Sequence, residues 1–189
     1  MIIVTRNQVT QRHILHPFFQ ESTPEDCRID TIISNGSSCL KIAFELTGKL
    51  DGLIIPAFEP SKARRKDNLW EGTCFEIFLG PAGLPNYWEF NLSPSGNWNV
   101  YSFAGYREGM KPDLHFDKLL YEIEILSENK LKLGTAIDTK LFKSFSGIDI
   151  GLSAVLERSD GVKSYWSMSH PGDTPDFHAR EGWLINFDT

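Results

Sequence analysis

The segment that most constrains the fold runs from residue 69 to residue 107 and reads LWEGTCFEIFLGPAGLPNYWEFNLSPSGNWNVYSFAGYR. Its stretches 73–79, 87–92 and 98–103 are short, rich in aromatic and β-branched residues, and separated by Gly, Pro, Asn and Ser. This pattern predicts three strands joined by turns. The segment shows no sustained period of about 3.6 residues, so a helix is not expected.

The alternation of side chains along a strand sorts these residues onto two faces. In 87–92, Trp88 and Phe90 share the face that we expect to be core. Glu89 and Asn91 point the other way. This alternation therefore predicts that the second face is a polar surface next to aromatic residues.

Glu76 lies on a mixed face of stretch 73–79, between Cys74 and Phe78. We expect its carboxyl group to be at least half buried. A buried charge without a partner is unfavourable by several kcal/mol, so such a carboxyl group must find donors or have a raised pKa. The candidate donors are Arg65, Arg107 and Tyr106.

Strand signals continue through the rest of the chain. They recur at 39–46, 53–56, 119–126, 131–136, 148–157, 164–168 and 183–187. Only 138–145 is compatible with a helical turn, with Asp138 as its N-cap. Many short strands bury one face each by packing as two sheets, so we predict an all-β antiparallel β-sandwich of jelly-roll type. At 189 residues, we expect it to form a single domain over 1–189.

The charge of the chain bears on its partners. The formal net charge is −6, and the one basic run, Lys62, Arg64, Arg65 and Lys66, is typical of a solvated loop. Binding to nucleic acid or to anionic membranes depends on clustered basic residues. We therefore expect neither nucleic acid nor a membrane as a partner.

The first 19 residues contain no uninterrupted apolar segment of the secretory kind, and nowhere do 18 apolar residues run together. A cytoplasmic location is therefore expected. Cys27, Cys39 and Cys74 are widely spaced and odd in number. This favours free thiols over a disulfide framework or a zinc site.

A longer pattern resembles a known family. Trp70 and Glu71 precede TCFEIFL, which is followed after a gap by YWEFNLSPSGNW, and later by SYWSMSHP and PDFH. Together these pieces, over about residues 41–187, resemble DOMON-like sandwich domains, in the bacterial branch similar to family 9 carbohydrate-binding modules. The resemblance implies an antiparallel β-sandwich that binds either sugars, stacked on paired tryptophans, or haem, held by axial Met and His ligands.

For sugar binding, the resemblance places Trp70 as the aromatic residue before the acidic strand and Glu76 as the acid of that strand. The second platform is open between Trp98, Trp166 and Trp183, and we favour Trp98, which borders a turn. The expected hydrogen-bonding residues are Glu71, Glu89, Asn91 and Arg107, and Glu76 is expected to orient the site without contacting the ligand. For haem, the available ligands are Met110 or Met168 with His170 or His178.

Two further clusters have a chemical and a structural interpretation. Glu76 and Glu89 have the residue types of a glycosidase acid and base, but buried carboxyl groups in sandwiches more often accept structural hydrogen bonds. Loop 170–178 holds His170, His178 and two aspartates in a spacing that matches no zinc signature. We favour a structural loop whose two histidines contribute to a ligand pocket.

No GxGxxG, P-loop, GxSxG or HExxH motif occurs in the chain. The sequence therefore predicts a non-catalytic module that binds a carbohydrate or another small polar ligand, without a metal or cofactor. The alternatives are a haem-binding or redox-related DOMON module, and a protein-interaction domain without a small ligand.

Overall fold

The computed structural model describes residues 2–5, 8–24, 26–36 and 38–188, and this part of the chain contains strands and short 3₁₀ turns but no α-helix. The strands are β1 (Ile2–Thr5), β2 (Gln8–Pro17), β3 (Arg28–Asn35), β4 (Cys39–Thr47), β5 (Cys74–Pro81), β6 (Tyr87–Leu92), β7 (Trp98–Phe103), β8 (Lys111–Pro112), β9 (Leu120–Ser127), β10 (Lys130–Asp138), β11 (Gly147–Glu157), β12 (Lys163–Ser167) and β13 (Ile185–Asp188). The 3₁₀ turns are η1 (Gln20–Ser22), η2 (Pro60–Lys62), η3 (Leu69–Glu71), η4 (Thr139–Leu141) and η5 (Arg180–Gly182). No helix in the described ranges is long and apolar enough to cross a membrane.

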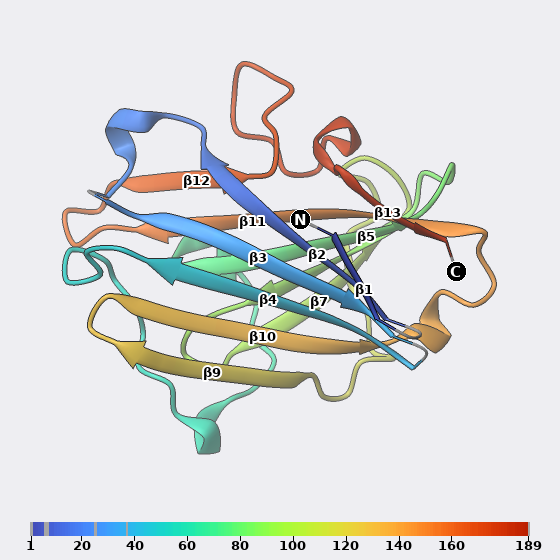
Figure 1. Cartoon of the computed structure of the whole chain (residues 1–189), viewed down its shortest axis with the longest axis horizontal. Helices are drawn as coiled ribbons and strands as arrows, with labels where there is room; N and C mark the ends of the chain where they lie inside the picture. The colour runs from blue at the N-terminus through green and yellow to red at the C-terminus, as the bar shows by residue number, and fades with distance from the viewer. Residues whose placement is uncertain (1, 6–7, 25, 37, 189) are drawn as a thin grey trace.

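The strands form one antiparallel sheet in the order β8-β7-β6-β5-β11-β12-β2-β3-β4-β10-β9, with β1 added to β2 and β13 added to β11. The pairing between β12 and β2 is short, since only Trp166 with Pro17 and Ser167 with His16 are in register. At this seam the sheet turns over, and its two halves lie one behind the other (Figure 1). The predicted antiparallel β-sandwich is confirmed.

The main core fills the space between the two halves. Phe44 of β4 and Phe75 of β5 come from opposite halves, and their ring centroids are 5.2 Å apart. β4 alternates between buried and more exposed residues, as expected for a strand with one face in the core. Trp88 packs against this core, as its alternation predicted, and its Nε1 donates to Asp113 Oδ2 at 2.9 Å.

The other face of β5, β6 and β7 is also buried, which explains why the alternation of β5 was unclear in the sequence. All eight residues of β5 are buried. A second apolar cluster covers this face and consists of Phe78, Tyr87, Tyr101, Phe103 and Trp183, with Trp70 and Phe177 packed against it. Trp70 and Phe177 come from outside the strands and pack against this face of the sheet.

Most predicted strands are present, with differences of one or two residues at the ends. The stretch 53–56 is not a strand and makes only an isolated bridge between Leu53 and Arg158. The strands β1, β2, β3 and β8 were not predicted. The helical turn predicted in 138–145 is the 3₁₀ turn η4, and Asp138 caps it by accepting a hydrogen bond from the Lys140 N–H at 2.9 Å.

Candidate ligand-binding site

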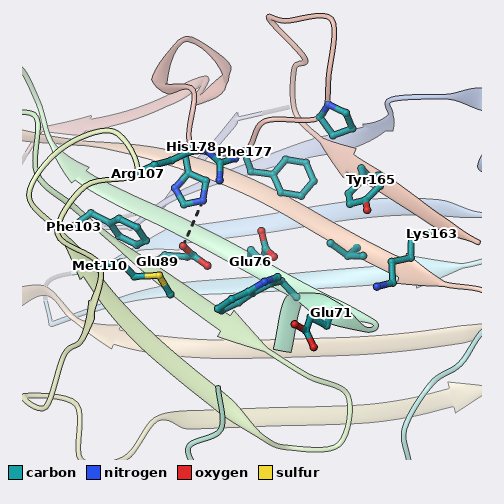
Figure 2. A pocket seen from close by; sticks show the side chains of 13 residues that line it. Glu71, Glu76, Glu89, Phe103, Arg107, Met110, Lys163, Tyr165, Phe177 and His178 are labelled. Carbon is teal, nitrogen blue, oxygen red and sulfur yellow. Dashed lines mark ion pairs between the residues drawn. The ribbon is translucent and has the colours of Figure 1, made fainter. Parts of the chain in front are cut away.

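An open pocket of about 430 Å³ lies over the second face of the β5–β6 half of the sheet (Figure 2). Its lining consists of Trp70, Glu71, Glu76, Glu89, Phe103, Arg107, Met110, Val155, Lys163, Tyr165, Pro175, Phe177 and His178. Pockets of this size class accept small molecules, usually through apolar walls and a few placed polar groups. This lining has both components.

The floor of the pocket contains two carboxyl groups, those of Glu76 in β5 and Glu89 in β6. In the β5–β6 register Glu76 is opposite Asn91, and Glu89 is opposite Phe78, so the two glutamates are diagonal neighbours on one face. Glu76 is 3% exposed and Glu89 is 4% exposed. Both side chains are part of the lining of the pocket (Figure 2).

Each carboxyl group has a hydrogen bond on one oxygen only within the described chain. Ser153 Oγ donates to Glu76 Oε2 at 3.1 Å. Asn91 Nδ2 donates to Glu89 Oε1 at 2.7 Å, and Cys74 Sγ lies 3.6 Å from Asn91 Oδ1, to which it donates. The remaining oxygens, Glu76 Oε1 and Glu89 Oε2, receive no hydrogen bond from the described residues.

Burial raises the pKa of both carboxyl groups, and the neighbouring charge of Glu89 raises the pKa of Glu76 further. The expectation that Glu76 is at least half buried, with a raised pKa, is confirmed. The predicted hydrogen-bond donors to Glu76, which were Arg65, Arg107 and Tyr106, are not confirmed. Arg65 is bound elsewhere, and the one hydrogen-bond donor that Glu76 has in the described chain is Ser153.

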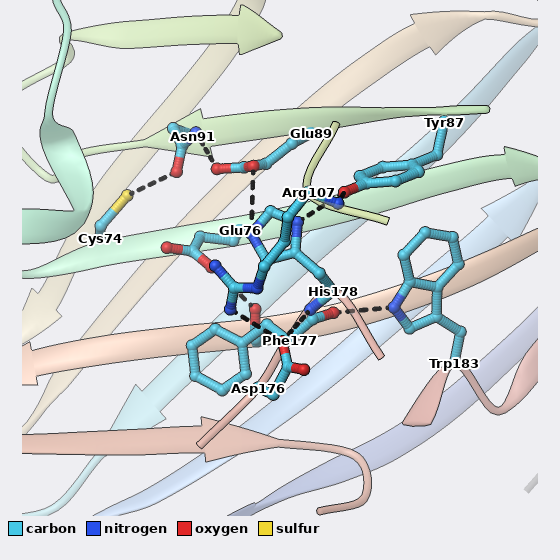
Figure 3. Close-up of polar contacts among 11 residues, drawn as sticks. Cys74, Glu76, Tyr87, Glu89, Asn91, Arg107, Asp176, Phe177, His178 and Trp183 are labelled. Carbon is cyan, nitrogen blue, oxygen red and sulfur yellow. Dashed lines mark hydrogen bonds and ion pairs between the residues drawn. The ribbon is translucent and has the colours of Figure 1, made fainter. Parts of the chain in front are cut away.

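His178 stands over Glu89 and is held by Tyr87 (Figure 3). Its Nδ1 lies 2.7 Å from the Tyr87 hydroxyl, which also accepts the Arg107 backbone N–H at 3.2 Å. Burial raises the pKa of Tyr87 to about 12, so the hydroxyl keeps its proton. The hydroxyl and Nδ1 therefore form a hydrogen bond, and the tautomer of the imidazole sets which of the two atoms donates.

The Nε2 of His178 points at Glu89 Oε2 across 3.7 Å, which is longer than a hydrogen bond. Burial, together with the charge of Arg107, lowers the pKa of His178 to about 4. The imidazole is therefore neutral at pH 7, and its contact with Glu89 is not an ion pair at that pH.

Asp176 fixes Arg107 at the edge of the pocket. Arg107 has the left-handed φ of 55°, and its guanidinium donates to Asp176 Oδ1 at 2.8 Å. The hydroxyl of Tyr106 donates to Oδ2 of the same carboxylate at 2.5 Å, and the His178 backbone N–H donates to Oδ1 at 3.1 Å. Two segments of the chain, 106–107 and 176–178, thus meet at one carboxylate, which places both Arg107 and His178.

The walls of the pocket are aromatic. Trp70, in η3, is partly exposed, and its ring meets that of Tyr101 edge-on with centroids 5.7 Å apart. Phe177, from loop 170–178, also lines the pocket. Glu71 and Lys163 are further residues of the lining (Figure 2). A ligand in this space would contact aromatic rings as well as the carboxyl groups of Glu76 and Glu89.

The structure brings together six of the nine predicted site residues: Trp70, Glu71, Glu76, Glu89, Arg107 and His178. Asn91 is fully buried behind the floor, where it holds Glu89. His170 lies elsewhere, with its Nε2 2.8 Å from the backbone oxygen of His16 and its ring edge-on to Phe18.

Trp98 is the main correction among the predicted site residues. It shares its face of β7 with Val100 and packs in the main core, 7% exposed. The guanidinium of Arg65 lies 4.5 Å from its ring centroid. Since Trp70 lies on the other side of the sheet, the expected clamp of Trp70 and Trp98 is not assembled. Trp166 and Trp183, the other candidates, are 2% and 8% exposed and do not line the pocket.

Several residues of the site were not predicted from the sequence. They are Tyr87, Phe103, Lys163, Tyr165, Asp176 and Phe177. The alternation of 87–92 already placed Tyr87 on the face of Glu89, so that residue could have been found. Asp176 could not, because its role depends on a contact with a residue 69 positions away.

The predicted haem ligands are divided among three places, one of which is the position of His170 against His16 and Phe18. Met110 and His178 both line the pocket, whereas Met168 is part of the main core. Among the described residues, no group of three or more His, Cys, Asp or Glu is arranged to hold a metal ion.

The chain was also compared with known proteins. No family model matches it, and no curated protein matches it in sequence. A crystal structure from Bacteroides uniformis, of a protein provisionally named as carbohydrate-binding, is similar with a TM-score of 0.68 and 13% identity, over 92% of this chain and 84% of that one. The chain thus has the fold of that protein.

Two further similar structures are of a family 9 carbohydrate-binding module from Caldicellulosiruptor kristjanssonii. The complex with cellotriose gives a TM-score of 0.47 at 9% identity, over 84% of this chain and 72% of that one. The complex with glucose gives a TM-score of 0.46 at 10% identity, over 84% of this chain and 76% of that one.

Proposed function

We propose that the pocket binds a carbohydrate and that the chain does not transform it. The observation that carries the proposal is the combination of the Trp70 wall with two buried carboxyl groups that each keep one oxygen without a donor. A sugar ring has a C–H face that stacks on an aromatic ring and hydroxyl groups that donate to carboxyl oxygens. The C–H face of a sugar therefore matches the Trp70 wall, and its hydroxyl groups match the carboxyl groups of the floor.

The shared fold with the Bacteroides uniformis protein, provisionally named as carbohydrate-binding, supports this proposal. The identity of 13% leaves the ligand of the present chain to be argued from its own residues. Membership of the DOMON-like branch, jelly-roll connectivity and a cytoplasmic location remain predictions from the sequence.

The affinity expected from one platform is modest. Covering about 100 Å² of the Trp70 ring contributes about 2.5 kcal/mol at about 25 cal/mol per Å². Part of this is offset by the loss of freedom on association, so a dissociation constant between about 1 mM and 1 μM is expected. Hydrogen bonds from the ligand to Glu76 and Glu89 would then select among sugars.

The test is calorimetric titration of the protein with soluble mono- and oligosaccharides, with tryptophan fluorescence followed in parallel. Trp70→Ala should weaken binding about tenfold or more, because it removes the platform. Trp70→Phe should retain much of the heat of binding but lose the fluorescence change. Trp98→Phe, in the core on the other face, is the matched control and should bind as the wild type does. Unchanged binding in Trp70→Ala, or no binding of any sugar, would overturn the proposal.

Glycoside hydrolysis is a second candidate, favoured by the two neighbouring carboxyl groups with raised pKa on one floor. Turnover of aryl glycosides that is lost in Glu76→Gln would establish it. A wild-type protein that binds sugars but releases no aryl group would exclude these substrates and leave the binding function in place.

Haem is the alternative ligand, because Met110 and His178 reach the same pocket. The fit is poorer than for a sugar. Nδ1 of His178 is taken by Tyr87, and its Nε2 faces the carboxyl group of Glu89, where a macrocycle needs a broad apolar slot. A Soret band on addition of haem, lost in His178→Ala, would favour haem. If neither sugar nor haem binds, a protein partner becomes the remaining alternative.

A further inference from the structure

The floor of the pocket contains more acceptors than the described chain can satisfy. Glu76 and Glu89 are both more than nine-tenths buried, and both line the pocket. Ser153 and Asn91 each satisfy one carboxyl oxygen. Glu76 Oε1 and Glu89 Oε2 have no hydrogen-bond donor in the described chain, and they are not among its fully buried unpaired atoms, so they are open to the pocket, where a ligand can donate to them.

The cationic side chains that line the pocket donate no hydrogen bond to the two glutamates, although the charge of Arg107 acts on both carboxyl groups and lowers their pKa against the effect of burial. The guanidinium of Arg107 donates to Asp176 Oδ1 at 2.8 Å (Figure 3). His178 is a neutral imidazole at pH 7, because burial and the charge of Arg107 lower its pKa to about 4. Lys163 is part of the lining (Figure 2). None of these three donates a hydrogen bond to Glu76 or Glu89.

An ammonium group would complete this floor better than a hydroxyl group would. It carries three donors, so one nitrogen can serve both free oxygens, whereas a hydroxyl group has a single proton to donate. Its charge would allow both carboxyl groups to ionise, with stronger hydrogen bonds than those between neutral groups. The partly exposed ring of Trp70 in the same pocket also favours a cation over a neutral group.

We infer that the ligand of this pocket is an amino sugar with a free amino group, which binds at the Glu76–Glu89 floor while its ring lies against Trp70. This inference rests on the proposed carbohydrate binding and specifies the class of sugar. An acetylated amine would have no charge and only one N–H donor, so the pocket should discriminate against it. Binding of the ammonium form should also release protons from the two carboxyl groups, since an adjacent cation lowers their pKa.

The experiment is calorimetric titration at pH 7 with three matched series: glucose, galactose and mannose, each as the parent sugar, the 2-amino sugar and its N-acetyl derivative. In the series that binds, the amino sugar should bind at least about tenfold more tightly than both of the others, which corresponds to about 1.4 kcal/mol. Repetition in buffers of different ionisation enthalpy should show net proton release for the amino sugar only. At pH 5, where both carboxyl groups are protonated, the preference should fall to about twofold or less.

Glu89→Gln should abolish the preference for the amino sugar and the proton release, because it removes one of the two charges of the floor. Glu108→Gln is the matched control, an exposed glutamate next to Arg107 that does not line the pocket, and should keep the preference. Parent sugars that bind as tightly as the amino sugars would overturn this inference and leave carbohydrate binding intact. If no sugar of any series binds, both the inference and the proposed function are overturned.

Discussion

The hydroxyl group of Tyr87 and Nδ1 of His178 lie 2.7 Å apart, although the two residues are 91 positions apart in the sequence. This bond joins β6 to the segment before η5 and sets which nitrogen of the imidazole faces Glu89. The hydroxyl also accepts the Arg107 backbone N–H at 3.2 Å, so one atom organises three parts of the pocket. The shape of the site therefore depends on a residue that would not itself contact most of a ligand.

Tyr87→Phe should destabilise the fold by about 1 to 2 kcal/mol, because it leaves the Arg107 N–H and the buried Nδ1 of His178 without their partner. Urea unfolding measures this change. Tyr106→Phe is the matched control, since its hydroxyl also contacts this region, through Asp176, but its side chain is 58% exposed. We expect its effect to be below about 0.5 kcal/mol. Equal effects of the two substitutions would contradict the structural role of Tyr87.

The pH dependence of stability should report the buried carboxyl pair. The pKa values of Glu76 and Glu89 are raised in the folded protein, so between the unfolded and folded pKa values the folded state holds more protons. Their contribution is fully present below the unfolded pKa near 4.5 and is lost as pH rises through the folded values. The slope is at most about 1.4 kcal/mol per pH unit for each proton that only the folded state holds.

Glu76→Gln tests this pH dependence, because the amide oxygen can still accept from Ser153 but does not ionise. Urea unfolding at several pH values from 5 to 8 should show wild type losing stability relative to the variant as pH rises. Comparing the two proteins cancels the opposite contribution of His178, whose pKa is lowered to about 4 and whose contribution is lost as pH falls below 6.5. Parallel curves would show that Glu76 does not titrate in this range.

The sequence contains most of the information on the strands and much less on which residues meet. β6 and β7 were predicted with their observed ends because turn residues border their aromatic runs on both sides. The alternation of β3 is equally regular, and Ile29, Thr31 and Ile33 are fully buried, so this strand could have been found as well. β2 is less visible, because polar side chains and histidines interrupt its apolar positions.

The position of Trp98 shows why the site was harder to predict. Its parity with Val100 in β7 already favours the core, but the polar residues around it suggested exposure. The partners of those residues are distant in the sequence. The guanidinium of Arg65 lies over the Trp98 ring and donates to Asn99 Oδ1 at 2.5 Å. Such long-range partners decide burial, and a single sequence does not indicate them.

Arg65→Lys should destabilise the protein by about 2 kcal/mol. The basic run around Arg65 was expected to be solvated, but its guanidinium stacks on Trp98 and donates to Asn99 and to the backbone oxygens of Asp113 and Phe116. An ammonium group cannot reproduce this planar set of donors. Thermal or urea unfolding measures the loss. Arg64→Lys, one residue earlier and exposed, is the control and should change stability by less than about 0.5 kcal/mol.

Gly151→Ala should destabilise the fold and weaken ligand binding together. A Cβ at Gly151 would lie 2.4 Å from Cδ1 of Trp183, which is packed in the second apolar cluster and cannot move freely. Overpacking of this kind typically destabilises by about 1 to 3 kcal/mol. Nε1 of Trp183 donates to the backbone oxygen of Phe177 at 2.9 Å, so a displaced indole would also shift a wall of the pocket.

Gly134→Ala in β10 is the control for that substitution, because the nearest atoms to its added Cβ are at the ordinary distances of 3.5 and 3.6 Å. Without a clash, alanine should be neutral or stabilise the strand by about 0.5 to 1 kcal/mol. Unfolding and sugar titration of both variants separate the two effects. If Gly151→Ala lost stability but bound sugar as tightly as Gly134→Ala, the indole of Trp183 would not be coupled to the pocket through Phe177.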